Sequence, residues 1–343
     1  MVNDLFIFQA RILASPLRSL KSRHPDLKSL ADVIPLLIAK SIASSTLKSY
    51  NQGFRAWSRW SARFEGVNSL PVNRLHLAAF IASVVQQGGK FGKVEHAFYG
   101  LNWIHNVLDL PNPCDSWLVR CVKNSAKRLL KTPVVKKCPI RPRHLRKLVR
   151  YFGSSSSLLD LRICAIALLS YAGFLRYDEV SRIRRSNVTF ERTYLKLFIE
   201  SSKTDQEGVG DHVFIARTRR STCPYQILKR YLKRAGMSNS DTNFVFRPVV
   251  RTKDGHRFKN VEKPISYTTA RDQVMGAIRT IGLNRTMFGM HSFRRGGATE
   301  AARRGISDRL FKKHGRWKSD NAKDGYVSED LETRLSVTKN IGV

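Results

Sequence analysis

The chain has 343 residues and a hydrophobic content of 42%, so it is long enough for two domains and too apolar to be disordered. Its 61 lysine and arginine residues against 26 aspartate and glutamate residues give a formal net charge of +35 at pH 7. This charge favours a polyanionic partner. Nucleic acid is a better candidate than an anionic membrane, because no apolar anchor accompanies the charge.

Cysteines and apolar runs narrow the class further. The five cysteines lack the paired spacing of a metal site, so we expect reduced thiols inside a cell. We also expect neither a bound metal nor a cofactor. The longest apolar run, Ile163 to Leu175, is too short to cross a bilayer and predicts a core helix. The short run Leu5 to Phe8 has no basic leader, so no secretory signal is expected.

Residues 1–40 are weakly patterned, and the first clear element is a helix over 41–64. Its apolar positions recur at helical spacing, whereas Lys48, Arg55 and Arg59 fall roughly on the opposite side. This basic face is either an ordinary solvated surface or a face that contacts phosphates. We include the three residues among the candidate DNA contacts.

Three more helices are expected before a linker. They cover 72–87, 93–110 and 116–131, and Gly88-Gly89, Pro111 and Pro133 end them. Residues 41–132 therefore predict a compact helical domain. Residues 133–141 contain prolines and no helical period, which predicts an extended basic linker whose Lys136 and Lys137 are further candidate DNA contacts.

Residues 142–343 predict a second domain that mixes helices and strands. Helices are expected over 142–152 and 158–171, strands over 187–190, 194–200 and 212–216, and more helices from about residue 225 onward. The polar stretch 203–210 predicts a hairpin turn between the last two strands. The expected fold is mainly α with a small antiparallel β-sheet, as a helical domain followed by an α+β domain.

The second domain also holds residues suited to breaking a phosphodiester without a metal ion, in the order Arg176, Lys203, His291, Arg294, Trp317 and Tyr326. Exchange of one oxygen for another at phosphorus adds negative charge to the nonbridging oxygens, and guanidinium groups can take up that charge. Arg294 lies three residues after His291, so both project from one face of a helix. Two arginines and an imidazole predict a clamp on one phosphate.

The motifs around these residues resemble the catalytic domain of the tyrosine recombinases. They are, in order, Gly-Phe-Leu-Arg-Tyr-Asp-Glu (173–179), Ser-Lys-Thr (202–204), His-Ser-Phe-Arg-Arg-Gly-Gly (291–297), His-Gly-Arg-Trp (314–317) and Asp-Gly-Tyr (324–326). The resemblance is strong over about residues 140–343. It is looser over the helical domain, which is similar to the SAM-like core-binding domain of that family.

The resemblance implies a DNA strand transferase that needs neither metal nor ATP. Tyr326 would attack the scissile phosphate and form a 3′-phosphotyrosyl bond, which leaves a free 5′-hydroxyl. His291 is implied as the proton acceptor, and Lys203, which matches the hairpin lysine of the family, as the proton donor to the departing oxygen. Glu179 resembles the acidic residue that orients the pocket, and Arg295 is a further candidate DNA contact.

Trp317 stands where most members of that family have a histidine. An indole N–H can donate to a phosphate oxygen but cannot shuttle a proton, so this side chain supports the site, fills the core, or does both. His314 has no assigned role.

The resemblance also implies partners and a location. The sequence 312–320, Lys-Lys-His-Gly-Arg-Trp-Lys-Ser-Asp, looks most like recombinases of eukaryotic mobile elements, the DIRS, Ngaro and crypton groups. This implies the nucleus, or the cytoplasm if the host is not eukaryotic. The family implies double-stranded DNA, four protomers on two DNA sites and a monomer off DNA. Residues 328–335 predict a short C-terminal helix of the kind that members pack onto a neighbouring subunit.

Two other functions stay open. A type IB topoisomerase uses nearly the same residues to relax DNA as a monomer, and a domesticated recombinase binds DNA without cutting it. All six positions hold chemically competent residues, which favours the active enzyme. The target sequence is not encoded in any motif, because specificity depends on base-edge contacts and DNA deformability.

Overall fold

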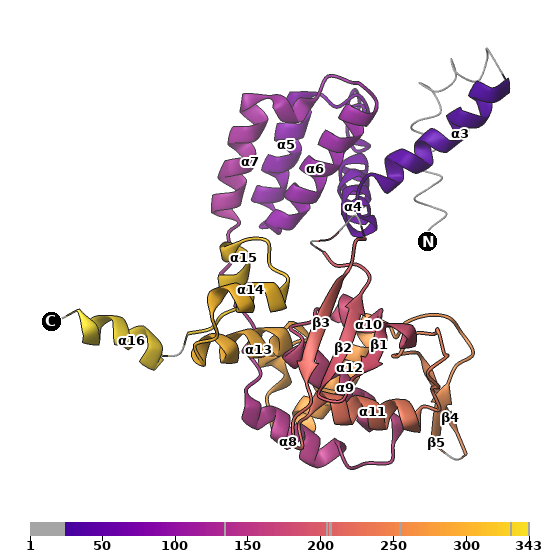
Figure 1. The fold of residues 1–343 in the computed structure, drawn as a ribbon. Coiled ribbons are helices and arrows are strands. Elements are labelled where there is room, and N and C mark those ends of the chain that lie inside the picture. The colour runs from indigo at the N-terminus through magenta and orange to yellow at the C-terminus, as the bar shows by residue number, and fades with distance from the viewer. Residues whose placement is uncertain are drawn as a thin grey trace. The chain divides into compact units, whose positions relative to one another are not determined.

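The computed structural model describes residues 25–133, 135–203, 205, 208–253, 255–329 and 331–341. The chain divides into two compact units, residues 1–134 and 135–343. Helices dominate both units, and the strands of the described residues lie in the second (Figure 1). The predicted fold class, mainly α with a small antiparallel sheet, is confirmed.

The first unit packs its helices around an aromatic core. Its elements are α3 (Pro25–Lys40), α4 (Ser44–Ser61), α5 (Arg74–Gln86), α6 (Phe91–Val107), the short η1 (Pro113–Asp115) and α7 (Trp117–Leu129). α4 packs along α6 and α5 along α7, and the ring of Phe80 meets Trp57 and Trp60 edge-on. The helices predicted between residues 41 and 131 are confirmed, with ends shifted by a few residues.

Two glycines let α4 and α6 cross closely. A Cβ atom on Gly53 would lie 1.9 Å from the carbonyl oxygen of His96, and one on Gly100 would lie 2.6 Å from that of Tyr50. The neighbours at both positions are backbone atoms, which cannot turn aside as a flexible side chain can. A larger residue at either position would therefore push the two helices apart.

Helix α3 lies in the stretch 1–40, where the sequence pattern predicts no element. Pro35 stands inside this helix, and local rules treat a proline as a helix end because it lacks an N–H and clashes with the preceding turn. Leu30, Val33 and Leu37 are exposed, so the apolar residues of α3 do not mark a face turned to the core. Residues 1–24, which include the run Leu5 to Phe8, lie outside the described residues.

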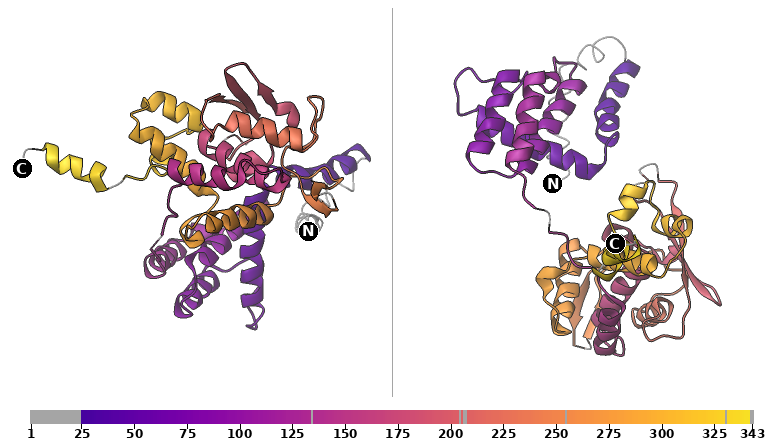
Figure 2. Two further views of the ribbon diagram at one scale, coloured as in Figure 1. Left: turned by 90° about the horizontal axis from the view of Figure 1, so that it is seen from below. Right: turned by 90° about the vertical axis from the view of Figure 1, so that its left-hand side faces the viewer.

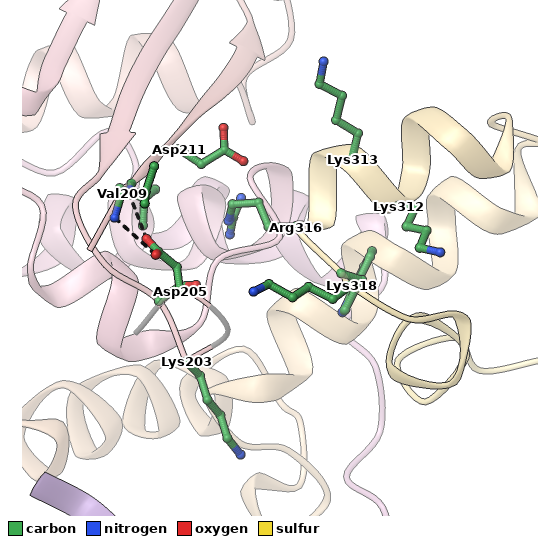
Figure 3. A pocket seen from close by; sticks show the side chains of 12 residues that line it. Lys203, Asp205, Val209, Asp211, Lys312, Lys313, Arg316 and Lys318 are labelled. Atoms are coloured by element: carbon green, nitrogen blue, oxygen red, sulfur yellow. Dashed lines mark hydrogen bonds between the residues drawn. The ribbon is translucent and has the colours of Figure 1, made fainter. Parts of the chain in front are cut away.

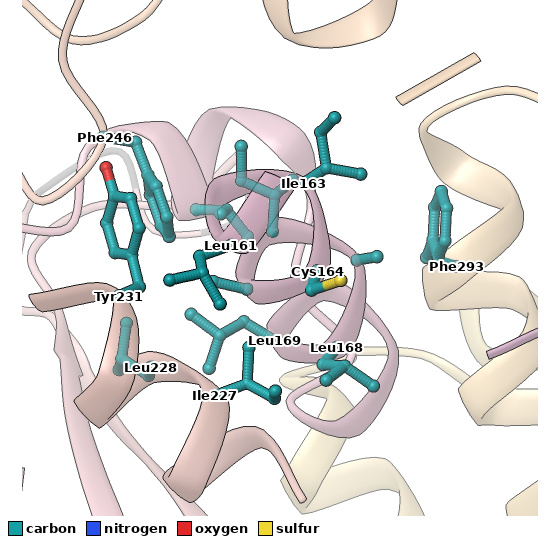
Figure 4. Packing of buried hydrophobic residues seen from close by; sticks show 14 of the residues in the cluster. Leu161, Ile163, Cys164, Leu168, Leu169, Ile227, Leu228, Tyr231, Phe246 and Phe293 are labelled. Atoms are coloured by element: carbon teal, nitrogen blue, oxygen red, sulfur yellow. The ribbon is translucent and has the colours of Figure 1, made fainter. Parts of the chain in front are cut away.

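The second unit surrounds one buried helix, α9 (Leu158–Ala172). This helix contacts helices on several sides, as the apolar run from Ile163 predicts, and Figure 4 shows Leu161 and Leu169 packed toward Ile227 and Leu228. The other helices are α8 (Pro142–Phe152), α10 (Tyr177–Ser181), η2 (Arg185–Asn187), α11 (Pro224–Arg234), α12 (Tyr267–Thr280), η3 (Arg285–Met287), α13 (His291–Arg303), α14 (Asp308–Gly315), α15 (Asp320–Asp324) and α16 (Leu331–Asn340). Figure 2 gives two further views of the chain, in which this unit can be followed.

Within the described residues, we find no helix whose length and hydropathy suit a membrane crossing.

Three antiparallel strands form the main sheet of the second unit. They are β1 (Val188–Phe190), β2 (Tyr194–Ile199) and β3 (Asp211–Ala216), with β2 in the middle. The strand predicted over 194–200 is confirmed as β2, and its alternating residues Leu195, Leu197 and Ile199 are buried on one face. A second hairpin, β4 (Val249–Thr252) and β5 (Gly255–Phe258), is not predicted, because four residues are too few to establish a periodic pattern.

Candidate active site

Arg176 and Glu179 are held by the turn that leads from α9 into α10. Arg176 is the N-cap residue of α10. The Glu179 carboxylate accepts the backbone N–H of Arg176 at 2.9 Å and its Nη1 at 2.7 Å. Helix α10 is short and ends at Ser181, so Arg176 and Glu179 lie within a single turn.

The Glu179 carboxylate, 3% exposed, joins three guanidinium groups. In addition to Arg176, its Oε2 accepts from Nη2 of Arg316 at 2.8 Å and lies 3.7 Å from Nη1 of Arg294. Burial acts to raise the pKa of this carboxyl, but the charges of Arg316, Arg294 and Arg176 outweigh burial and hold the pKa below its ordinary value. Glu179 is therefore ionised at neutral pH and fixes the directions of the arginines around it.

Arg294 lies one turn after His291 on α13 and is fully buried. Its Nη1 donates to the carbonyl oxygen of Phe174, and its Nη2 donates to that of Gly315 at 2.8 Å. Burial and then the charge of Arg176 lower the pKa of this guanidinium to about 10, which still leaves it charged at neutral pH. Arg294 is thus a fixed cation inside the unit.

His291 begins α13 and remains exposed beside a group of cations. The pKa of its imidazole is lowered, first by partial desolvation and then by the charges of Arg294, Arg176 and Lys203. A lowered pKa leaves the ring neutral at pH 7, and a neutral ring has one nitrogen free to accept a proton. The surroundings of His291 therefore suit a proton acceptor.

Trp317 is buried in a small apolar cluster with Phe174 and Phe311, and Tyr326 packs against it. The ring centroid of Tyr326 lies 5.5 Å from that of Trp317 and 4.8 Å from Cζ of Arg294. The indole N–H of Trp317 is buried without a hydrogen-bond partner. Trp317 therefore fills the core and also keeps an unused hydrogen-bond donor, so its two interpretations are compatible.

The short helix α15 sets the position of Tyr326. The backbone N–H of Tyr326 donates to the carbonyl oxygen of Lys323 at 2.9 Å. The Lys323 ammonium in turn lies within ion-pair distance of three carboxylates, those of Asp308, Asp320 and Asp324. Tyr326 is thus held by ion pairs beneath its own segment as well as by ring contacts.

Lys203 lies on the exposed loop between β2 and β3, at a cavity of about 650 Å³. Residues of α14 and the segment after it form another wall of this cavity, with Lys312, Arg316 and Lys318 among them. Figure 3 shows Lys203 extending away from the other labelled side chains. The charge of Lys203 contributes to lowering the pKa of His291.

Three of the predicted DNA contacts share one face of the first unit. Lys48, Arg55 and Arg59 are exposed on α4, while Phe54 and Trp57 of the same helix are buried. The basic and apolar faces of this helix are confirmed.

The other predicted DNA contacts lie where the second unit begins, and they are partly engaged within the protein. The Lys136 ammonium donates to the carbonyl oxygen of Gly325 at 3.5 Å, and the Lys137 ammonium donates to that of Thr286. Arg295 donates from Nη1 to the carbonyl oxygen of Lys137 at 2.8 Å. Arg295 therefore helps to hold the start of this unit in place.

Arg316 is a residue of this site that the sequence interpretation misses. It ends α14 with a left-handed backbone (φ 55°), a conformation that costs a non-glycine residue about 1–2 kcal/mol. The only sequence feature that could have identified Arg316 as a site residue is its position directly before Trp317. In a chain with 61 lysine and arginine residues, one more basic residue carries little weight without its contacts.

His314, which has no role in the sequence interpretation, supports the turn before α10. Its Nε2 donates to the carbonyl oxygen of Ala172 at 2.7 Å, and its ring meets that of Phe174 edge-on. Desolvation lowers the pKa of His314, so the ring stays neutral and keeps this hydrogen bond.

Metal ligands do not gather in the part of the chain that the structure describes. No group of three or more histidine, cysteine, aspartate or glutamate side chains there is arranged to hold a metal ion.

Comparison with protein families gives one match. Residues 140–332, more than half of the chain, match the model described as the phage integrase family. A protein from Selenomonas ruminantium described as an integrase/recombinase xerD homolog is 25% identical over 331 residues, which are 95% of this chain and 90% of that protein.

Solved structures of two recombinases share the fold. One is the XerH site-specific recombinase bound to a palindromic difH substrate in a post-cleavage complex. It superposes with a TM-score of 0.61 at 15% identity, and the match covers 98% of this chain and 95% of the XerH chain. The other is a lambda integrase (75–356) dimer bound to a COC′ core site. It superposes with a TM-score of 0.56 at 17% identity, and the match covers 88% of this chain and 95% of the lambda integrase chain. At these identities the likeness shows the fold alone.

Proposed function

Because the chain belongs to the phage integrase family, we propose that it is a site-specific DNA recombinase that cuts and rejoins strands through Tyr326. The observation that carries this proposal is the packing of the Tyr326 ring 4.8 Å from Cζ of the buried Arg294. Arg176 lies in the same site. Burial acts to lower the pKa of its guanidinium, but Glu179 and then the phenol of Tyr326 raise this pKa above its ordinary value. A phenol beside two fixed cations is placed to meet a phosphate.

The proposed reaction exchanges one phosphate ester for another. The Tyr326 oxygen forms a bond to phosphorus, the bond from phosphorus to the 5′-oxygen breaks, and His291 takes the phenol proton. Lys203 gives a proton to the departing 5′-oxygen once the loop that carries it reaches the DNA. Rejoining reverses these steps, so the ester energy is conserved without ATP or a metal ion.

The cations around the phosphate have different proposed shares. Both terminal nitrogens of Arg294 already donate to backbone carbonyls, so Arg294 contributes mainly its charge. Arg176 has one terminal nitrogen on Glu179 and is the better candidate for direct contact with a nonbridging oxygen. The unpartnered indole N–H of Trp317 offers another donor to the same phosphate.

Double-stranded DNA is the proposed partner, and α4 is its proposed contact in the first unit. The exposed Lys48, Arg55 and Arg59 would neutralise phosphates and release counterions. We also propose that four protomers assemble on two DNA sites from monomers, with α16 packing onto a neighbouring subunit. Truncation before α16 that leaves assembly on DNA intact would remove the last part of this proposal.

The host remains a further proposal. The sequence at 312–320 supports a eukaryotic mobile element and a nuclear location, while the named relative at 25% identity comes from Selenomonas ruminantium. The genome that encodes the chain decides between the two.

Covalent capture tests the proposed reaction directly. Purified protein is incubated with randomised nicked duplexes that trap a cleaved end, and the adduct is mapped by mass spectrometry while the captured DNA is sequenced. We expect an adduct on Tyr326, no adduct with Tyr326→Phe, and nearly equal DNA affinity for both proteins. Affinity should fall steeply with salt in both.

The other outcomes identify the competing functions. An adduct on another residue, or cleavage that stops when a chelator is added, would contradict the mechanism. Binding without any adduct would indicate a domesticated DNA-binding protein. Relaxation of plasmids by the monomer, without matched sites, would indicate a topoisomerase.

A further inference from the structure

We propose that Arg316 is a positioning residue that holds the Glu179 carboxylate and ties the segment bearing Trp317 and Tyr326 to α10. The proposal rests on strand transfer by Tyr326. Arg316 would not touch the phosphate itself but would act through Glu179 and through the hydrogen bonds of its side chain to backbone carbonyls.

The side chain of Arg316 joins two distant parts of the second unit. It is 6% exposed, and its Nη2 donates to Oε2 of Glu179 at 2.8 Å. The remaining bonds go to three backbone carbonyls, those of Gly173, Phe174 and His314. One guanidinium thus connects the end of α14 to the turn that sets Arg176 and Glu179, which are about 140 residues earlier in the chain.

The backbone conformation at position 316 would suit glycine, so it does not explain the presence of arginine there. The N–H of Trp317 donates to the carbonyl oxygen of Lys312 at 3.2 Å, which closes α14 with Arg316 in a left-handed position that glycine usually fills. The ring of Trp317 folds back over Gly315, where a Cβ atom would lie 1.9 Å from it. Glycine at 316 would form this turn without strain, so the benefit of arginine lies in its side chain.

The charge of the Arg316 side chain acts mainly on Glu179. Three charged groups face this buried carboxylate, namely Arg316, Arg294 and Arg176, and Arg316 makes the largest contribution to lowering its pKa. Without Arg316, burial would raise the pKa of Glu179 with less opposition. A protonated Glu179 would hold Arg176 and Arg294 less firmly, and their misplacement would slow the reaction.

The test compares Arg316→Gly with Arg316→Lys in the full chain. Glycine removes the charge and suits the backbone, whereas lysine keeps the charge. Rates of covalent capture at saturating DNA are measured across the acidic and neutral range. We expect Arg316→Gly to be slower on the order of a hundredfold at neutral pH and to slow further as pH falls and Glu179 takes up a proton. Arg316→Lys should keep the wild-type pH profile and a rate within about tenfold.

Hydrogen exchange of residues 317–326 supplies a readout that does not depend on catalysis. Faster exchange in Arg316→Gly than in Arg316→Lys is expected. Equal protection in both, or a wild-type rate and pH profile in Arg316→Gly, would overturn the proposal. So would equal slowing of both variants with an unchanged pH profile, since that result indicates a merely structural residue.

Two further provisions keep the result interpretable. Arg316→Gln, which keeps a polar side chain but loses the charge, takes the place of Arg316→Gly if the glycine variant does not fold. Failure of the wild-type protein to form an adduct at Tyr326 would count against the proposed function. Hydrogen exchange would then still decide whether Arg316 holds this segment.

Discussion

The two units bury polar side chains in opposite ways. Among the described residues of the first unit, the buried polar side chains are Ser61 and His105, and His105 is held neutral. Its Nδ1 donates to the carbonyl oxygen of Leu101 at 2.8 Å, and its Nε2 accepts the N–H of Val72 at 3.0 Å. The second unit instead buries Glu179 and Arg294 as ions.

The difference separates folding from chemistry. An apolar core with one neutral histidine stabilises a domain, because it buries no charge that needs a partner. Buried ions cost free energy of desolvation and are tolerated only with close partners, as around Glu179. They are useful where an anion has to be met by cations that are already fixed. The first unit is therefore built for stability and the candidate site for preorganisation.

The largest effect on folding is expected from Trp57→Ala. Trp57 is fully buried, and its indole N–H donates to the carbonyl oxygen of Ser69 at 3.0 Å. Its loss should lower the free energy of unfolding of the first unit by about 3–5 kcal/mol, as measured by urea unfolding followed by circular dichroism. Trp117, 79% exposed, is the matched control, and its replacement by alanine should change stability by less than about 0.5 kcal/mol. Equal losses would refute the proposed core.

A pair of variants should separate binding from chemistry. Arg294→Ala should lose about 3–4 kcal/mol of transition-state stabilisation in capture at saturating DNA while affinity changes little. Replacing Lys48, Arg55 and Arg59 together by glutamine should do the reverse, reducing affinity and lowering the salt slope by about three while the saturated rate stays unchanged. Circular dichroism confirms that each variant is folded. Loss of rate in the triple variant would contradict this division.

The smallest effect concerns the acid stability of the first unit. Desolvation lowers the pKa of His105 below 6.5 in the folded protein, so the unfolded chain binds the proton more readily. Stability is then complete above about pH 6.5 and falls below it, by at most about 1.4 kcal/mol per pH unit. Unfolding curves at neutral and acidic pH should show this slope. It should vanish in His105→Gln and persist in the exposed control His96→Gln.

Local patterns account for most of what the sequence predicts correctly. The helices of the first unit, the core helix α9 and the alternation in β2 all follow from periodicity within one element. Short motifs likewise predict the family, and the match to the phage integrase family confirms that prediction. Helix α3 is missed because Pro35 interrupts its pattern, and the β4–β5 hairpin is missed because its strands are brief.

The candidate site also contains contacts that local spacing predicts and one contact that it does not. Arg176 with Glu179, and His291 with Arg294, are pairs three residues apart that one helical turn brings together, so their relation can be read from spacing. The bond between Arg316 and Glu179 spans 137 positions and depends on a left-handed backbone at residue 316. No local pattern encodes such a contact, and only the folded chain reveals it.

The glycine crossing of α4 and α6 bears on how a target is chosen. Backbone meets backbone at Gly53 and Gly100, so α4 is packed closely against α6 and has little room to shift toward a duplex. Its basic side chains from Lys48 to Arg59 span about 16 Å along the helix. If they contact DNA as proposed, the double helix has to adjust its groove to them, and easily kinked pyrimidine–purine steps should be over-represented among the sites this protein selects.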